Sequence, residues 1–238
     1  MKTLYQGRRE WLKRACGALA GAGLGLNGAA AQTQKPVFRD ADRTRDKIVA
    51  LVRSFGSDDP RAMRHIQKIE PIAEVTIPGM KVPPDQLPLM DYFVGDLHLR
   101  YSFDDPSFVS GVSASDLKRL GLKRDQLLPL SVENFRRLYP GRKIEYPLPQ
   151  IALVTDAGDL EPCLMLDAAF WEKETQRRGS AIVAAAPARD VLMFSDRSVR
   201  GNVEILKKLS VEVHATAANE ALSKTVFLWN QGRWEAFA

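Results

Sequence analysis

The chain has 238 residues, of which 26% are charged and 45% are hydrophobic, and its formal net charge is +5. This length suits one domain with a sizeable hydrophobic core. Of the two cysteines, Cys16 and Cys163, only Cys163 lies in the body of the chain, which excludes an internal disulfide there, so stability has to come from the core.

The first 31 residues have the three parts of a twin-arginine export signal. Arg8 and Arg9 precede an apolar run over residues 15–26, and three alanines ending at Ala31 form a small-residue cleavage site. The run is too short and too rich in glycine to span a bilayer, so we expect cleavage and no stable membrane insertion of the mature chain; the alternative is an uncleaved anchor. The signal implies export by the twin-arginine translocase, already folded, to the periplasm or the cell exterior.

Most of the positive charge belongs to this signal. Residues 1–31 hold five cations and one anion, a net of +4 out of the whole-chain +5, so the mature part carries about +1. A nearly neutral chain with both signs mixed gives no case for nucleic acid or an anionic membrane as a partner. The partner of the mature chain is otherwise unknown.

The mature chain is predicted to be a short polar tether over residues 32–38 and then one domain over residues 39–238. Apolar spacing predicts a helix over residues 40–55, followed by Gly56 as its C-cap. A strand-like segment follows over residues 70–77. Residues 97–103 alternate polar and apolar side chains, which predicts a half-buried strand paired in a hairpin with residues 89–94.

The second half of the chain alternates helices with strand pairs. Ser113 and Asp116 have the spacing of a capping box, which predicts a helix from residue 113. The expected elements are helices over 113–120 and 125–139, strands over 143–146 and 151–155, a helix over 162–177, strands over 181–186 and 191–194, a helix over 203–213, and a hairpin of 225–229 with 234–237. Strands joined by short turns are antiparallel neighbours, so the pattern predicts an α+β fold.

Three stretches together resemble the YtpQ-like family of uncharacterised bacterial proteins. They are Val94-Gly95-Asp96-Leu97 through Leu120-Gly121-Leu122, then Ser131 to Phe135, and then Asp159 to Asp167 with Ala186 to Leu192; the ending from Trp229 to Trp234 also fits. The resemblance covers roughly residues 70–238. It implies a shared fold, and it implies no activity, because none is established for the family. Cys163 stands where a serine is expected, which counts against a nucleophile at that position.

The histidines and nearby carboxylates give one candidate polar cluster. None of His65, His98 and His214 pairs with another at metal-ligand spacing, so we expect neither a metal nor a cofactor. His98 with Asp96, Asp104 and Asp105 is able to gather imidazole and carboxylates at one strand end. The other interpretation is a solvated strand face followed by an aspartate-rich turn.

Cys163 and Ser195 are the candidate nucleophiles. Cys163 is near the start of a predicted helix, where the helix dipole would lower a thiol pKa, with His98 or His214 as a conceivable base. The apolar residues that follow Cys163 favour a buried structural thiol instead. Ser195 lacks the flanking glycines of a nucleophile elbow.

Asp167 and a tryptophan pair complete the candidates. Asp167 interrupts an apolar stretch, so it is either buried beside a cation, for which Arg189 is the natural choice, or the N-cap of a helix that begins at Ala168. Trp229 and Trp234 flank one turn and are expected to pair across the hairpin, although a ligand platform is the alternative.

The sequence favours a non-catalytic domain that binds a macromolecule or a small ligand, because nucleophile motifs, metal spacings and phosphate loops are missing from the mature chain. The alternative is a hydrolase of cell-envelope substrates that uses Asp96, Asp104 and Asp105 with His98. Geometry separates the two: convergence of these groups with Arg189 in one cleft favours the enzyme, and scattering favours the binding domain.

Overall fold

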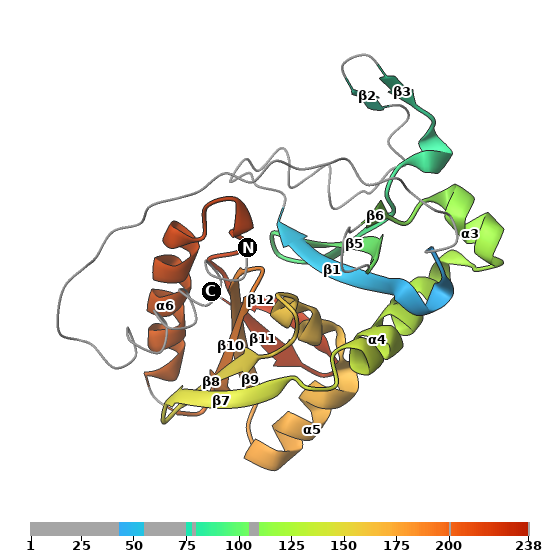
Figure 1. The fold of residues 1–238 in the computed structure, drawn as a ribbon. Helices are drawn as coiled ribbons and strands as arrows, with labels where there is room; N and C mark the ends of the chain where they lie inside the picture. The colour runs from blue at the N-terminus through green and yellow to red at the C-terminus, as the bar shows by residue number, and fades with distance from the viewer. Residues whose placement is uncertain (1–42, 55–74, 78–79, 105–109, 200, 238) are drawn as a thin grey trace.

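The computed structural model describes residues 43–54, 75–77, 80–104, 110–199 and 201–237 (Figure 1). The predicted export signal with Arg8, Arg9 and Ala31, the predicted tether, His65 and Asp105 lie outside these residues. Within the described part, no helix is long and apolar enough to cross a membrane. Helices and antiparallel sheets make up the fold, which confirms the α+β class.

The larger sheet has six antiparallel strands. Their order is β12-β11-β9-β10-β8-β7, so each hairpin of consecutive strands lies beside the next one. The predicted strand pairs after residue 140 are therefore confirmed. The strands are β7 (Lys143–Leu148), β8 (Ile151–Thr155), β9 (Ile182–Ala188), β10 (Val191–Asp196), β11 (Val226–Asn230) and β12 (Arg233–Phe237).

A smaller sheet is built from the first half of the chain. Its strands are β1 (Ile48–Ser54), β4 (Met90–Val94), β5 (Leu97–Phe103) and β6 (Ser110–Gly111), with β5 between β1 and β4 and also paired with β6. The β4–β5 hairpin is the predicted one. A separate pair, β2 (Val75–Ile77) with β3 (Met80–Val82), projects away from the rest of the fold (Figure 1).

The helix predicted over residues 40–55 is wrong within the part of this segment that the structure describes, because Ile48–Ser54 form strand β1. A single 3₁₀ turn precedes Ile48, and the whole strand then pairs with β5, from Ile48 opposite Phe103 to Ser54 opposite Leu97. The continuous apolar run Ile48–Val52 is buried throughout. A strand buried on both faces has no alternation, so its apolar spacing fits a helix equally well.

Strand β5 is also more buried than its alternating sequence predicts. His98 is 7% exposed and Ser102 is fully buried, although both sit at the positions expected to face solvent. The prediction of a half-buried strand at 97–103 is therefore wrong, because β5 is buried on both faces.

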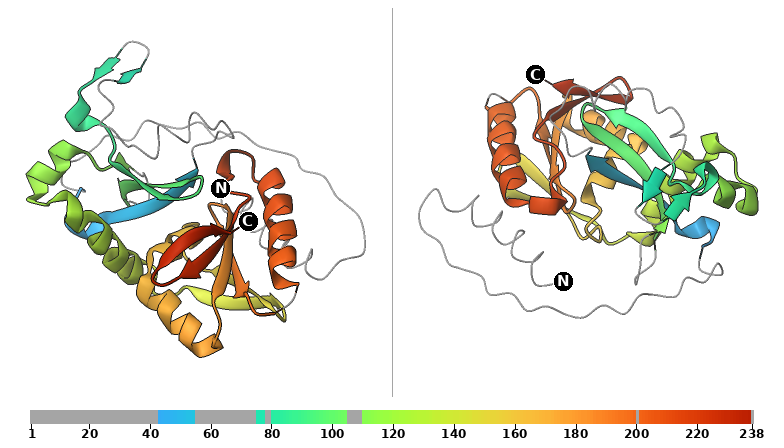
Figure 2. Two further views of the ribbon diagram at one scale, coloured as in Figure 1. Left: turned by 180° about the vertical axis from the view of Figure 1, so that it is seen from behind. Right: turned by 90° about the horizontal axis from the view of Figure 1, so that it is seen from above.

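Helices cover both faces of the larger sheet (Figure 2). On one face α6 (Asn202–Thr216) packs Leu206 and Val213 against alternate strand residues such as Val183. On the opposite face lie α5 (Ala168–Arg178) and the small sheet. The first-half helices are α3 (Ala114–Leu120), whose N-cap Ser113 forms the predicted capping box with Asp116, and α4 (Leu127–Leu138), which packs against β1.

The single helix predicted over residues 162–177 is two elements. A 3₁₀ segment covers Glu161–Leu166, and α5 begins after Asp167. The Asp167 side chain accepts the Phe170 backbone N–H at 3.0 Å, and the buried Trp171 donates its indole N–H to the Leu164 carbonyl at 2.8 Å. These two bonds satisfy backbone groups at the junction, so the chain changes direction there without an unsatisfied helix end.

Aromatic rings fill the space between the two sheets. Trp171 lies edge-on to Phe194 and to Trp234, with ring centroids 5.1 Å and 4.9 Å apart. The same buried cluster includes Leu97 of the small sheet, so one core joins both sheets. Trp234 also lies directly opposite Trp229 across the last hairpin, at 5.2 Å, which confirms the predicted pairing.

Candidate functional site

The predicted polar cluster does not form one site. Asp96 precedes β5 and Asp104 follows it, which places them roughly 26 Å apart at about 3.3 Å per strand residue. Asp96 accepts a hydrogen bond from the Ser223 hydroxyl at 2.6 Å, whereas Asp104 accepts one from the Tyr139 hydroxyl. The expectation that these carboxylates meet at one strand end is wrong, because they lie at opposite ends of the same strand.

His98 lies in a cationic environment. It faces Arg53 across the β1–β5 pair, and burial together with Arg53 and Arg100 lowers its pKa to about 4. Burial and the neighbouring Arg189 lower the pKa of Arg53 to about 10. His98 is therefore neutral at physiological pH. Within the described ranges, no three His, Cys, Asp or Glu side chains are grouped so that they could hold a metal ion.

Cys163 has the environment of a structural thiol. It is 4% exposed and lies within a 3₁₀ segment and not at the start of a regular α-helix. Burial raises the pKa of this thiol to about 11, so it is protonated at neutral pH. A protonated and inaccessible thiol is a poor nucleophile, which supports the structural interpretation.

The cation beside Asp167 is Arg136 and not the predicted Arg189. The Arg136 guanidinium donates to both carboxylate oxygens of Asp167, from Nε at 2.8 Å and from Nη2 at 2.5 Å. Arg142 lies 4.0 Å from the same carboxylate. Arg189 instead forms an ion pair with Glu220 at 2.7 Å, because the β9–β10 turn that carries it meets the segment after α6.

Asp167 combines the two roles that the sequence presents as alternatives. It is 3% exposed and ion-paired, and it is also the N-cap of α5. Burial by itself would raise the pKa of Asp167, but hydrogen bonds from Arg136 and from the Phe170 N–H outweigh it, so the pKa lies below its ordinary value. The carboxylate therefore stays ionised and holds Arg136 in place.

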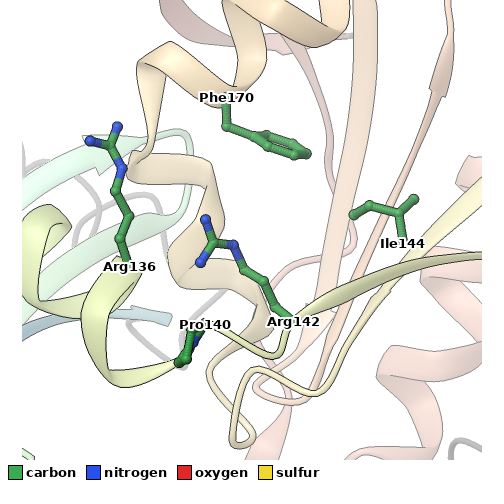
Figure 3. A pocket seen from close by; sticks show the side chains of 5 residues that line it. All are labelled: Arg136, Pro140, Arg142, Ile144 and Phe170. Atoms are coloured by element: carbon green, nitrogen blue, oxygen red, sulfur yellow. The ribbon is translucent and has the colours of Figure 1, made fainter.

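A surface cavity of about 450 Å³ that is open to solvent lies beside this ion pair (Figure 3). Arg136 comes from the last turn of α4, Arg142 directly precedes β7, Ile144 is its second residue, and Phe170 comes from the first turn of α5. Pro140 in the α4–β7 turn completes the lining. Figure 3 shows the Arg142 guanidinium and the Phe170 ring directed toward the same space, with Ile144 across from them.

The cavity presents more positive than negative charge. Arg142 donates from Nη1 to the Tyr139 carbonyl at 3.1 Å, and its guanidinium lies 5.7 Å from the centre of the Phe135 ring. An arginine has five N–H donors, so both lining arginines keep donors beyond those used by Asp167 and Tyr139. With the apolar Ile144 and Phe170 surfaces alongside, the cavity is able to bind a small anion that carries an apolar group.

The sequence interpretation missed Arg136, Arg142 and Phe170. The available signal was weak: Arg136 is in the last turn of a predicted helix, where a cation usually complements the helix dipole. The two arginines flank the Pro140-Gly141 helix stop, which brings both to one turn. Their meeting with Phe170 is a long-range contact that no local pattern encodes.

Comparisons with known proteins do not assign the chain to a family. No family model matches the chain, and neither the curated proteins nor the solved structures contain a match. The resemblance to the YtpQ-like family therefore stays a prediction.

Proposed function

We propose that the mature chain is an exported, non-catalytic binding domain whose cavity between α4, β7 and α5 takes a ligand with an anionic group next to an apolar one. One observation carries this: Arg136 and Arg142 meet Phe170 and Ile144 around a single cavity of about 450 Å³. This volume lies in the range of small-ligand pockets, roughly 300–1,000 Å³. The twin-arginine signal supports the export of the folded domain to the periplasm or the cell exterior.

The ion pair at the cavity wall supports binding by preorganisation. Arg136 is about half exposed, yet two hydrogen bonds from its guanidinium to the buried Asp167 fix its position. A ligand that meets a fixed cation loses less free energy to the ordering of side chains. Asp167 is 3% exposed and lies behind the arginine, so it orients the cation with little direct repulsion of an incoming anion.

The chemistry of the lining supports binding over acid–base catalysis. Arginine stays protonated in proteins, so Arg136 and Arg142 attract and orient an anion but do not accept a proton from a substrate. The candidate groups of the alternative hydrolase lie apart, with Asp96 and Asp104 at opposite ends of β5. This separation favours the binding domain, because the hydrolase alternative requires these groups to converge in one cleft.

Calorimetric titration of the mature protein with phenylpropionate tests the proposal. Arg142→Gln should weaken binding about tenfold or more, because a charge-assisted hydrogen bond contributes about 1.5–3 kcal/mol. Arg142→Lys keeps the charge and should weaken binding less than Arg142→Gln does. The uncharged phenylpropionamide should bind more weakly than the acid.

Arg189→Gln is the matched control, since Arg189 is also a partly exposed, ion-paired arginine but does not line the cavity. The Arg189→Gln variant should bind phenylpropionate with the same affinity as the wild type. Equal affinities of wild type and Arg142→Gln, or equal binding of the acid and the amide, would overturn the proposal.

A further inference from the structure

Strand β7 leaves one edge of the larger sheet unpaired. It is the outermost strand, it pairs with β8 on one side, and no other strand among the described residues pairs with its second edge. In Figure 1, β7 runs along the border of the sheet from the end of α4. An edge strand presents a row of backbone N–H and C=O groups that another extended chain can pair with.

The cavity and this edge belong to one surface. Arg142, Ile144 and Tyr146 alternate along the chain, so they point to the same side of the sheet. That side faces α5, because Ile144 packs in the core cluster with Trp171 and the Tyr146 hydroxyl accepts hydrogen bonds from Arg177 and Arg178. The cavity wall therefore continues along the edge as far as Tyr146.

The edge allows pairing only over a short length. The register between β7 and β8 shifts between Glu145 and Leu148, and Pro147 lies within that irregular stretch. Proline lacks a donor and a bulge bends the strand, and both features discourage unspecific strand addition. Regular edge geometry is thus confined to Lys143–Glu145, next to the cavity residues Arg142 and Ile144.

Charge on this surface favours an acidic partner. Arg136, Arg142, Arg177 and Arg178 flank the α5 side of β7, while Asp167 and Glu174 are the carboxylates that pair with them there. Arg178 also pairs with Asp196, so four cations face three carboxylates and the flank keeps a small positive excess. An incoming acidic segment complements this excess.

We propose that an extended segment of a partner protein adds as a strand to the free edge of β7 and directs an acidic side chain into the Arg136–Arg142 cavity. Backbone hydrogen bonds to β7 provide affinity, and alternate side chains provide specificity. The acidic residue lies at the level of Arg142, and the residue two positions along the segment, which is apolar, lies at the level of Ile144. The inference rests on the proposed function and narrows its ligand to an acidic extended peptide.

Fluorescence anisotropy with labelled peptides tests this inference on the mature protein. The probe is a short peptide of alternating valine and threonine with one central glutamate. Replacement of the glutamate by glutamine should weaken binding about tenfold, and so should Arg142→Gln. Two further peptides carry N-methyl groups on one or the other set of alternate amides. The peptide whose methylated amides face β7 should not bind, although the protein is unchanged.

Amide chemical shifts locate the bound peptide. The shifts should change along Lys143–Tyr146, and those of β12, the opposite edge of the same sheet, should stay constant as an internal control. If both N-methylated peptides bind as well as the parent, or if the shifts change at β12, strand addition is refuted. If strand addition is refuted but phenylpropionate still binds in an Arg142-dependent manner, the proposed function stands. If neither the peptide nor phenylpropionate binds, the proposed function is refuted as well.

Discussion

At the scale of single residues, the ion pair of Asp167 with Arg136 organises the candidate site. Because the carboxylate is buried and the guanidinium is bidentate, a double-mutant cycle of Asp167→Asn with Arg136→Gln should give a coupling energy of about 1–3 kcal/mol. The same cycle with Arg189→Gln should give a value near zero. Urea unfolding of the four variants measures both, and coupling to Arg189 instead of Arg136 would disprove the assignment.

The pH dependence of stability follows from the same carboxylate. The pKa of Asp167 is lower in the folded state than in the unfolded chain, so below neutrality the unfolded state takes up the proton first and stability rises with pH. The stabilisation is complete above the ordinary carboxyl pKa, about 4, and is lost as the pH falls through the folded value. Wild type should exceed Asp167→Asn in unfolding free energy by a constant margin at neutral pH and by a smaller one near pH 3. A margin that does not change with pH would contradict this.

Cys163 is predicted to be inert in the folded protein. It is 4% exposed with a pKa raised by burial to about 11, so a thiol reagent should label it slowly in the native state and at once in denaturant. In a protein that begins at Gln32, Cys163 is the single cysteine, so the absorbance of the released reagent reports it alone. Rapid labelling of the native protein at neutral pH would restore Cys163 as a candidate nucleophile.

At the scale of elements, the β4–β5 turn depends on Gly95. Its φ is +58°, and an added Cβ would lie 3.1 Å from the Phe227 ring. Gly232, in the β11–β12 turn, has φ +84° with open space around it, so Gly232→Ala isolates the backbone strain, roughly 1–2 kcal/mol. Gly95→Ala should cost about 1 kcal/mol more in unfolding free energy, through overpacking against Phe227. Equal losses for the two variants would show that the Phe227 contact adds nothing.

The elements also show which parts of the fold the sequence could predict. Hairpins were predictable, because turn residues such as Asn230 and Gly232 interrupt two runs of strand-forming residues. Strand β1 was not, since its burial on both faces removes the alternation that identifies a strand. The end of the 3₁₀ segment at Asp167 was visible as a possible N-cap, but its partner Arg136 lies 31 residues earlier in the chain and was not. Local chemistry was therefore predictable, and contacts between distant elements were not.

At the scale of the whole molecule, the proposed export signal over residues 1–31 predicts where the mature protein begins. Cleavage after Ala31 should yield a chain that begins at Gln32, because the alanines at 29 and 31 fit the small-residue positions of a signal peptidase site. Replacement of both Arg8 and Arg9 by lysine should block export. Intact-mass measurement of the exported protein checks the cleavage site, and a mature chain that begins before residue 25 would contradict it.

The central claim is that the cavity between α4, β7 and α5 binds an anion with an apolar group. A titration of isotope-labelled mature protein with phenylpropionate, followed by NMR, tests it most directly, because it locates the ligand without any mutation. The amide and side-chain signals of Arg136, Arg142, Ile144 and Phe170 should shift together and saturate with one dissociation constant. Saturable shifts confined to another part of the surface, or none at all, would contradict the account.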